Sequence, residues 1–370
     1  MTEAHPTDGT PAAARRWRKV RVIWNPQAGQ KAGITTNRTS GEDMVAMLEA
    51  QGLADEICET TSAEDAPRLA AEAARDGFDL VVAAGGDGTI GAVATELLGT
   101  DTTLGILPLG SIMNIARSLG LPRDLAGAVE VLATGELRSI DVGEVNSKPF
   151  FENGSVGMNA AMFREAQEFE QGDWLSILRT VWVAFRYRPA RMEVRLDDRR
   201  IRTRALMITV SNGPYTGPAM TVAPDARLDD GHFDVRIFRR FSKVQLIRHL
   251  ASIAFGRRRY APEVSTFRSA RVRVESAHPL PCRADSEDLG TTPVDFVTRP
   301  KALRVVVPPP AIREPGGSAH ARLGRRALRR RGLARRPLHE PFPELRTASL
   351  GVEPADVDVA VRGPLRGPTG

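Results

Sequence analysis

The chain of 370 residues has only two cysteines, few aromatic residues and no long apolar run. Cys58 and Cys282 lie far apart, and His278 is the only histidine near either of them, so we expect neither a disulfide framework nor a zinc site. No run approaches the roughly 20 apolar residues that a membrane-spanning helix needs. The N-terminal residues are basic but lack the apolar stretch of a signal peptide. We therefore expect a cytoplasmic protein.

Lysine is also scarce, because arginine supplies almost all of the positive charge behind the formal net charge of +6. Arginine is most concentrated at 322–336, in a C-terminal segment that is rich in proline and glycine and shows no apolar periodicity. We therefore expect residues 309–370 to form a disordered tail.

Short apolar runs alternate with amphipathic stretches from residue 18 to residue 145. Helices are expected between strands at 20–24, 55–60, 78–84, 102–109 and 139–145. The strand at 78–84 is continuously apolar, so neither of its faces is expected to meet water. Because no hairpin signals separate the strands, the pattern predicts a parallel sheet that helices cover on both faces.

The pattern changes in the second half, from residue 146 to residue 308. Short strands are separated by Asp, Gly and Pro turns and are expected at 191–198, 205–212, 220–224, 233–240, 270–276, 293–298 and 302–308. Two helices interrupt them, at 173–187 and 242–255. This half therefore predicts an antiparallel β-sandwich domain.

The sequence GGDGT, residues 85–89, directly follows the continuously apolar strand. Gly85 and Gly86 allow positive φ and close approach of backbone amides to a ligand, and a helix that begins near Thr89 directs its free N–H groups to the same point. This combination suits phosphate, and Asp87 between them could hold a metal ion or orient a hydroxyl. The alternative is an ordinary strand-to-helix loop with Thr89 as the N-cap.

Two further glycine-containing loops follow predicted strands. NPQAG, 25–29, follows the first strand, and PLGS, 108–111, follows the fourth. Parallel strands bring their C-terminal ends to one edge of the sheet, where ligands bind. The three loops together therefore predict a nucleotide site, although each alone is only a turn.

These motifs resemble, in order, those of the diacylglycerol kinase catalytic family of lipid kinases. The resemblance rests on NPQAG, GGDGT, PLGSIMNIAR, DARLDDGHFDV and RADSEDLGTTPVDFVTRP, and it spans about 20–308. It implies a Rossmann-like α/β nucleotide-binding domain at 18–145 and a β-sandwich lipid-substrate domain at 146–308. It also implies an ATP-dependent enzyme that uses Mg2+ and phosphorylates a lipid hydroxyl.

The resemblance also implies roles for individual residues. The nucleotide-binding positions fall on Asn25, Gly29, Thr60, Gly85, Gly86, Asp87, Gly88, Thr89, Ile90, Gly91 and Ser111. Glu287 matches the proton acceptor, with Asp285 beside it and Asp87 opposite. A structural magnesium would use Asp230 with the carbonyl groups of Arg227 and His232. Taken alone, the segments around Asp285 and Asp230 could equally be a solvated turn and a hairpin turn.

The chain departs from the family pattern at three places. Gly91-Ala92 stands where Asn-Glu is common, and Met113-Asn114 stands where Asn-Asp is usual, which removes a carboxylate. Ser286 replaces the glycine of Asp-Gly-Glu, where a positive φ is expected. Two other functions therefore stay open, namely an NAD kinase-like enzyme with a soluble substrate and a catalytically silent lipid- or nucleotide-binding regulator.

A kinase of this class must reach an acceptor in a membrane. The basic stretch 322–336 is expected to bind the surface of an anionic membrane, which predicts a cytoplasmic protein with peripheral membrane association. No aromatic residues are interleaved with these arginines, so nucleic acid is not an expected partner. The identity of the lipid and the oligomeric state stay open.

Overall fold

The computed structural model describes residues 16–31, 34–35, 41–170, 179–180, 182–183, 186–216, 220–239 and 264–309. The helix predicted at 242–255, most of the one predicted at 173–187, and residues 310–370 of the predicted tail lie outside these residues. Across the described ranges, no helix is both long enough and apolar enough to cross a membrane.

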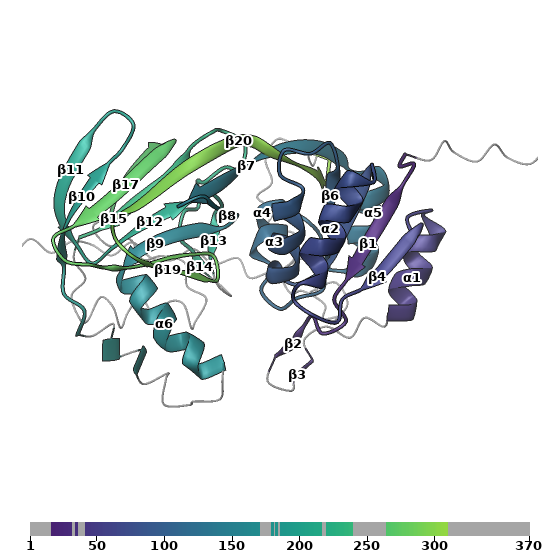
Figure 1. Ribbon diagram of the computed structural model, residues 1–370, viewed down its shortest axis with the longest axis horizontal. Coiled ribbons are helices and arrows are strands. Elements are labelled where there is room, and N and C mark those ends of the chain that lie inside the picture. Colours follow the sequence, from purple (N-terminus) through teal and green to yellow (C-terminus); the bar gives the residue numbers. More distant parts are fainter. Residues whose placement is uncertain are drawn as a thin grey trace, which may run out of the picture. The chain divides into compact units, whose positions relative to one another are not determined.

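Four parallel strands form one end of a ten-stranded sheet in the described chain (Figure 1), in the order β4-β1-β5-β6. They span Val20–Trp24 (β1), Glu56–Glu59 (β4), Leu80–Gly85 (β5) and Thr103–Pro108 (β6). Every residue of the two central strands β5 and β6 is buried, as their continuous apolar sequences predict. The parallel arrangement predicted for this region is confirmed.

Helices connect these parallel strands. They span Gly41–Ala50 (α1), Asp65–Arg75 (α2), Asp87–Glu96 (α3), Asn114–Ser118 (α4) and Leu125–Thr134 (α5). Their apolar residues pack with those of the strands in one hydrophobic core, which includes Trp17. The Nε1 atom of Trp17 also donates a hydrogen bond to the carbonyl of Leu132 at 3.0 Å. Gln30–Lys31 (β2) and Ile34–Thr35 (β3) form a separate antiparallel pair after β1.

The same sheet continues beyond β6 with strands from the second half of the chain. The order is β6-β20-β17-β10-β11, and β7 also pairs with β20 and with β8. These strands span Glu136–Val145 (β7), Lys148–Phe150 (β8), Ala190–Arg195 (β10), Arg200–Ala205 (β11), Arg271–Ser276 (β17) and Val294–Val307 (β20). Only β20 continues the parallel set, through Val305 beside Leu104.

Two strand predictions were wrong in this region. The strand predicted at 139–145 was assigned to the parallel sheet, but β7 pairs antiparallel with β20 and with β8. The two strands predicted at 293–298 and 302–308 are one long strand, β20. A register irregularity between Arg299 and Leu303, where Lys301 has φ 52°, lets β20 continue through a segment that reads as a turn.

A second sheet of the described chain is antiparallel and has the order β16-β15-β12-β9-β18-β19. Its strands span Asn153–Gly157 (β9), Met207–Ser211 (β12), Phe233–Phe238 (β15), Val264–Ser269 (β16), Pro281–Ala284 (β18) and Glu287–Thr291 (β19). A hydrophobic core that includes Phe150, Phe233 and Phe296 lies between the two sheets, which confirms the predicted sandwich. The helix Met158–Glu170 (α6) lies on the other side of this sheet (Figure 1), and Tyr215–Thr216 (β13) pairs with Met220–Thr221 (β14).

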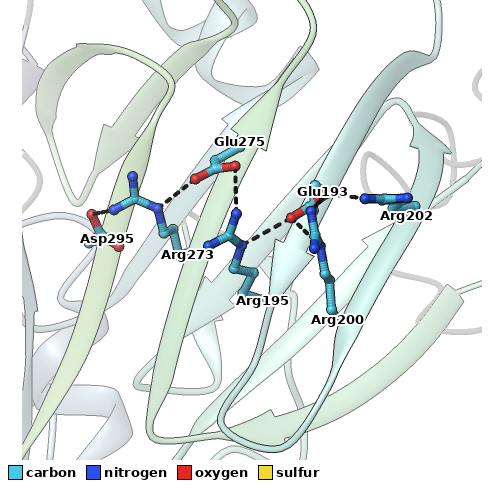
Figure 2. Close-up of polar contacts among 7 residues, drawn as sticks. All are labelled: Glu193, Arg195, Arg200, Arg202, Arg273, Glu275 and Asp295. Atoms are coloured by element: carbon cyan, nitrogen blue, oxygen red, sulfur yellow. Dashed lines mark hydrogen bonds and ion pairs between the residues drawn. The ribbon is translucent and has the colours of Figure 1, made fainter.

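The outward face of β10, β11 and β17 carries a network of exposed ion pairs (Figure 2). Glu193 lies among Arg195, Arg200 and Arg202, and a second carboxylate, Glu275, joins Arg195 to Arg273. Hydrogen bonds from Arg200 and the other arginines lower the pKa of Glu193 to about 2. Pairs this exposed to water stabilise a fold only weakly. The network therefore marks the solvated face of the sheet, opposite the core.

Candidate active site

The first two predicted loops contact each other at the C-terminal edge of the parallel strands. Asn25 follows β1, and its backbone amide donates to the carbonyl of Ala84 at 2.9 Å. Its side-chain amide donates to Oγ1 of Thr89 at 3.2 Å, while its side-chain oxygen accepts the amide of Gln27 at 2.9 Å. The turn continues to Gly29, which has φ 81°. Asn25 thus joins the loop after β1 to the loop after β5.

In the second loop, Gly85 is required by space rather than by positive φ. Neither Gly85 nor Gly86 has positive φ, contrary to the prediction, and α3 begins at Asp87 with Gly86 as its N-cap at φ −89°. Thr89 is therefore not the cap. A Cβ at Gly85 would lie 2.6 Å from Cβ of Thr89, so a larger residue cannot fit. The amides of the first turn of α3 are directed to the edge of the sheet.

The third loop packs against the second. Leu109 donates its amide to the carbonyl of Gly85 at 3.0 Å. A Cβ at Gly110 would lie 2.7 Å from Cα of Gly86, so only glycine permits this approach of the two backbones. Ser111 follows directly, and its carbonyl accepts from Arg123 at 3.1 Å. The predicted convergence of the three loops is therefore present in the geometry.

The carboxylate of Asp87, in the second loop, binds the first residues of α4, the helix that follows the third loop. Its two carboxylate oxygens accept the backbone amides of Asn114, at 3.1 Å, and Ile115, at 3.2 Å. These are the first amides of α4, which has no intrahelical acceptor for them. Met113 precedes them in a left-handed conformation, with φ 59°. Asp87 therefore lies where the second and third loops meet.

Thr60 lies beside the first loop. It is the residue after β4, it is buried, and its amide donates to the carbonyl of Trp24 at 2.8 Å. The remaining predicted nucleotide positions, Gly88, Ile90 and Gly91, lie in α3. The predicted set therefore gathers at one edge of the sheet, while its contact with nucleotide stays a prediction.

Asp285 is half-buried beneath the turn that joins β8 to β9. Its carboxylate accepts three backbone amides, from Phe151 at 2.7 Å, Glu152 at 2.9 Å and Asn153 at 3.1 Å. Burial raises the pKa of Asp285. The three amide donors favour the ionised form and so lower this pKa, but their effect is smaller than that of burial. The positive φ expected at Ser286 occurs instead at Asp285, at 46°. The carboxylate of Asp285 therefore holds the turn through three hydrogen bonds, while its predicted catalytic role stays a prediction.

Glu152, in that turn, is a residue that the motifs did not indicate. Its Oε2 accepts from the side-chain amide of Asn114 at 2.8 Å, and the backbone amide of Asn114 is bound by Asp87. Burial, with the nearby carboxylates of Asp285 and Asp87, raises the pKa of Glu152 to about 8. The only sequence signal was an acidic residue inside the apolar run FFENGSVG. Asn114, in turn, stands where the family pattern has a carboxylate.

Glu287, the matched proton acceptor, has a different environment. It is the first residue of β19, its side chain is about half exposed, and it forms an ion pair with Lys148. No hydrogen bond joins it to Asp87, Asn114 or Glu152 in the described residues. Its assignment as the proton acceptor stays a prediction, whereas Glu152 contacts Asn114 at the start of α4.

The predicted structural magnesium site lies in the turn after residue 226. The carboxylate of Asp230 accepts from the amide of His232 at 3.0 Å and from the guanidinium of Arg268. Arg227 binds the neighbouring Asp229 at 3.1 Å. Arg268 already supplies the positive charge at Asp230, and no group of three or more metal-ligating side chains occurs in the described part of the chain. Because the predicted ligands are one carboxylate and two backbone carbonyl groups, the structural magnesium stays a prediction, and no step of the proposed reaction depends on it.

Comparisons with known proteins found matches for both halves of the chain. The model of the diacylglycerol kinase catalytic domain matches residues 19–145, and that of the YegS C-terminal NAD kinase beta sandwich-like domain matches residues 155–307. A diacylglycerol kinase of Bacillus subtilis (strain 168) is 29% identical over 297 residues, which cover 79% of this chain and 97% of that protein. A "Probable lipid kinase YegS-like" protein of Klebsiella pneumoniae (strain 342) is 30% identical over 283 residues, which cover 75% and 94%.

The fold has a solved counterpart as well. The crystal structure of a diacylglycerol kinase from Bacillus anthracis str. Sterne is similar with a TM-score of 0.62 at 19% identity, covering 80% of this chain and 99% of that one. The chain therefore belongs to the family of diacylglycerol kinases and YegS-like lipid kinases, and these relatives support kinase activity. The resemblance found in the motifs is confirmed, while the boundaries at 145 and 308 stay predictions.

Proposed function

We propose that this protein transfers the γ-phosphoryl group of ATP to a hydroxyl group of a lipid. The observation that carries the proposal is the position of Asp87, whose carboxylate joins two glycine loops at the edge of a parallel sheet. Backbone amides of these loops would hold the phosphates of ATP, and Asn25 would orient the first loop against them. Mg2+ that arrives with ATP would neutralise charge on the phosphate oxygens.

In the proposed reaction, the lipid oxygen forms a bond to the γ-phosphorus while the bond to the β,γ-bridging oxygen breaks, which releases ADP. The proton of the hydroxyl goes to a carboxylate. Glu152 is placed for this role because it contacts Asn114, which Asp87 also binds. The ionised form of Glu152, which its raised pKa makes the minor form at neutral pH, is a stronger base than an ordinary carboxylate. Asp285 acts on the reaction only by holding the turn that carries Glu152.

The proposal is tested by incubating the protein with γ-labelled ATP and a total lipid extract, with and without Mg2+. We expect label in a lipid fraction for the wild type and a loss of about a hundredfold or more for Asp87→Asn. Equal, negligible transfer by both proteins would favour a catalytically silent regulator. Label in soluble nucleotide rather than lipid would favour an NAD kinase-like enzyme.

A second experiment identifies the proton acceptor. Glu152→Gln keeps an oxygen for the amide of Asn114 but cannot take a proton, and we expect the transfer rate to fall about a hundredfold or more. Glu287→Gln, which loses only a solvated ion pair, is the matched variant and should keep most of the rate. A large loss of transfer rate in Glu287→Gln, with little loss in Glu152→Gln, would identify Glu287 as the proton acceptor.

Membrane binding through the basic stretch 322–336 is part of the same proposal, although this stretch lies outside the described residues. Clustered arginines contribute about 1 kcal/mol each near an anionic membrane surface. Deleting residues after 315 should therefore weaken binding to anionic vesicles at low salt. If the truncated protein co-sediments with the vesicles as well as the full chain does, the tail does not contribute to membrane binding.

A further inference from the structure

Arg117 is a half-buried arginine beside the carboxylates of the candidate active site. It belongs to α4, the short helix whose first two amides bind Asp87. Its Nη1 atom donates a long hydrogen bond of 3.4 Å to Oδ1 of Asn114. The nitrogen of the same side-chain amide, Nδ2, donates to Glu152 at 2.8 Å. The amide of Asn114 therefore lies between the guanidinium group of Arg117 and the carboxylate of Glu152.

An aromatic ring holds this guanidinium group in place. Cζ of Arg117 lies over the ring of Tyr215, 4.1 Å from the ring centre. Tyr215 is the first residue of β13, which packs against α4 (Figure 1). A cation over an aromatic face is attracted to the ring without giving up a hydrogen bond to an oxygen acceptor. The ring of Tyr215 therefore fixes the position of the charge and leaves its N–H donors for other partners.

The charge of Arg117 is not paired with a carboxylate. No ion pair joins its guanidinium group to an acidic side chain in the part of the chain that the structure describes. Arg283, another cation near Glu152, is engaged differently, because it faces both Asp285 and Glu152 and donates to the carbonyl of Asp285. A guanidinium group has five N–H donors, and the long bond to Asn114 uses one of those of Arg117. The remaining donors can bind an anion.

Asn114 explains why Arg117 lacks an acidic partner. The family pattern has a carboxylate at this position. An aspartate would place a negatively charged oxygen where Oδ1 of Asn114 lies, 3.4 Å from Nη1 of Arg117, and this is the distance of an ion pair. The neutral amide of Asn114 instead leaves the charge of Arg117 available, and it still holds Glu152 through Nδ2. The substitution at residue 114 thus changes what Arg117 can bind.

The position of Arg117 suits the group that is transferred in the proposed reaction. The backbone amide of Asn114 binds Asp87 of the second glycine loop, whereas its side-chain amide contacts Glu152 and Arg117. The γ-phosphoryl group must lie between the glycine loops and the proton acceptor, so it comes close to Asn114 and to Arg117. Charge on the oxygens of this group is what a guanidinium group stabilises in phosphoryl transfer.

We propose that Arg117 is a catalytic residue that binds the γ-phosphoryl group while it moves from ATP to the acceptor. The proposal rests on the proposed function for the phosphoryl donor and the direction of transfer, but it holds for a lipid or a soluble acceptor. The guanidinium N–H groups donate to oxygens of the γ-phosphoryl group while the acceptor oxygen bonds to its phosphorus and the bond to the β,γ-bridging oxygen breaks. Arg117 itself stays protonated throughout, because a guanidinium group does not lose its proton in proteins.

Binding is tested without turnover, by the thermal unfolding midpoint of the full chain with ADP and Mg2+, with and without aluminium fluoride. Aluminium fluoride stands in for the phosphoryl group in transfer, so it should raise the midpoint of the wild type beyond the effect of ADP. Arg117→Met should keep the effect of ADP and lose most of this additional rise. The same additional rise in Arg117→Met and the wild type, or none in either, would overturn the proposal.

Kinetics distinguish a catalytic role of Arg117 from a structural one. Arg117→Met should lower kcat about a hundredfold or more and leave KM for ATP within about twofold, because the contact is made in the transition state. Arg117→Lys keeps the charge but has no planar guanidinium group, so its kcat should lie between the two. The matched control is Arg199→Met, because Arg199 also lies near an aromatic ring, at 6.0 Å from that of Phe267, but in the turn between β10 and β11. It should keep kcat.

Added guanidinium chloride completes the test, at concentrations below those that unfold the protein. It should restore part of the rate of Arg117→Ala, because a free guanidinium ion can occupy the vacated space, whereas lost packing would not be restored. A raised KM for ATP with unchanged kcat in Arg117→Met would overturn the proposal. Label in lipid at the wild-type rate in Arg117→Met would refute the role of Arg117 and leave the lipid kinase assignment standing. Label only in a soluble acceptor, with an aluminium fluoride effect that needs Arg117, would support Arg117 and refute the lipid acceptor.

Discussion

Replacing Glu152 by glutamine should stabilise the protein at pH 8 and change its stability little at pH 5. Glu152 is half-buried near two other carboxylates, and the loss of water together with these charges raises its pKa from 4.5 to about 8. The unfolded chain, where the pKa is ordinary, therefore loses its proton first as the pH rises. Stability of the wild type falls through the window between these two pKa values, because the ionised form is tolerated better in the unfolded chain.

The size of the effect follows from the two pKa values. Each unit of difference corresponds to about 1.4 kcal/mol, so the wild type should lose about 3 kcal/mol between pH 5 and pH 8 through this residue. Glutamine keeps an acceptor for the side-chain amide of Asn114 and does not titrate in this range. The variant should therefore lack most of this decline.

The assay is urea denaturation of both proteins, followed by circular dichroism at several pH values from 5 to 8. Glu287→Gln is the control, because its half-exposed side chain forms only a solvated ion pair with Lys148. The difference between the wild type and Glu152→Gln should grow with pH, whereas the control should run parallel to the wild type. A difference between the wild type and Glu152→Gln that is equal at pH 5 and pH 8 would refute the environment described for Glu152.

Two further substitutions probe the loops of the site, and a third probes a buried carboxylate in β7. Gly110→Ala should weaken ATP binding and destabilise the fold by about 1–3 kcal/mol, because its Cβ would lie 2.7 Å from Cα of Gly86; an unchanged unfolding midpoint would contradict this contact. Gly88→Ala, which meets nothing within 4 Å, should not destabilise the protein. Asp141→Asn should lower the free energy of unfolding, measured by chemical denaturation, by about 2 kcal/mol, because this buried carboxylate accepts the amides of Gly231 at 2.6 Å and Lys301 at 2.8 Å. A variant as stable as the wild type would show that these two hydrogen bonds are dispensable.

The parallel part of the fold could be predicted because its strands are continuously apolar and end in glycine loops. The three loops at its edge followed from the same pattern, since parallel strands end on one side. The course of β20 could not be predicted, because Arg299, Pro300 and Lys301 read as a turn between two strands. Only the pairing of β7 along both halves of this segment shows that it is one strand.

The carboxylates of the site were harder to assign from the sequence. Asp285 and Glu287 belong to one motif, yet one is enclosed by three amides and the other is paired with Lys148 near the surface. Glu152 belongs to none of the motifs, and its role depends on the contact with Asn114, which is distant in sequence. Motif spacing does not encode which carboxylate of the second half meets the loops of the first.

The burial of polar residues in the second sheet, such as Ser155, Thr209 and Ser211, escaped prediction for a related reason. Alternating polar and apolar residues in β9, β12 and β15 are typical of a sheet with one face in the core and one in water. The polar residues of these strands are instead buried, and this could be learned only from the packing around Ser155 and Thr209.

A crystal structure of the protein with a non-hydrolysable ATP analogue and Mg2+ would test the account most directly. We expect the phosphates against the amides after Gly86 and Gly110, with the γ-phosphate between Asp87 and Glu152. An analogue bound elsewhere, or a γ-phosphate remote from both carboxylates, would contradict the account.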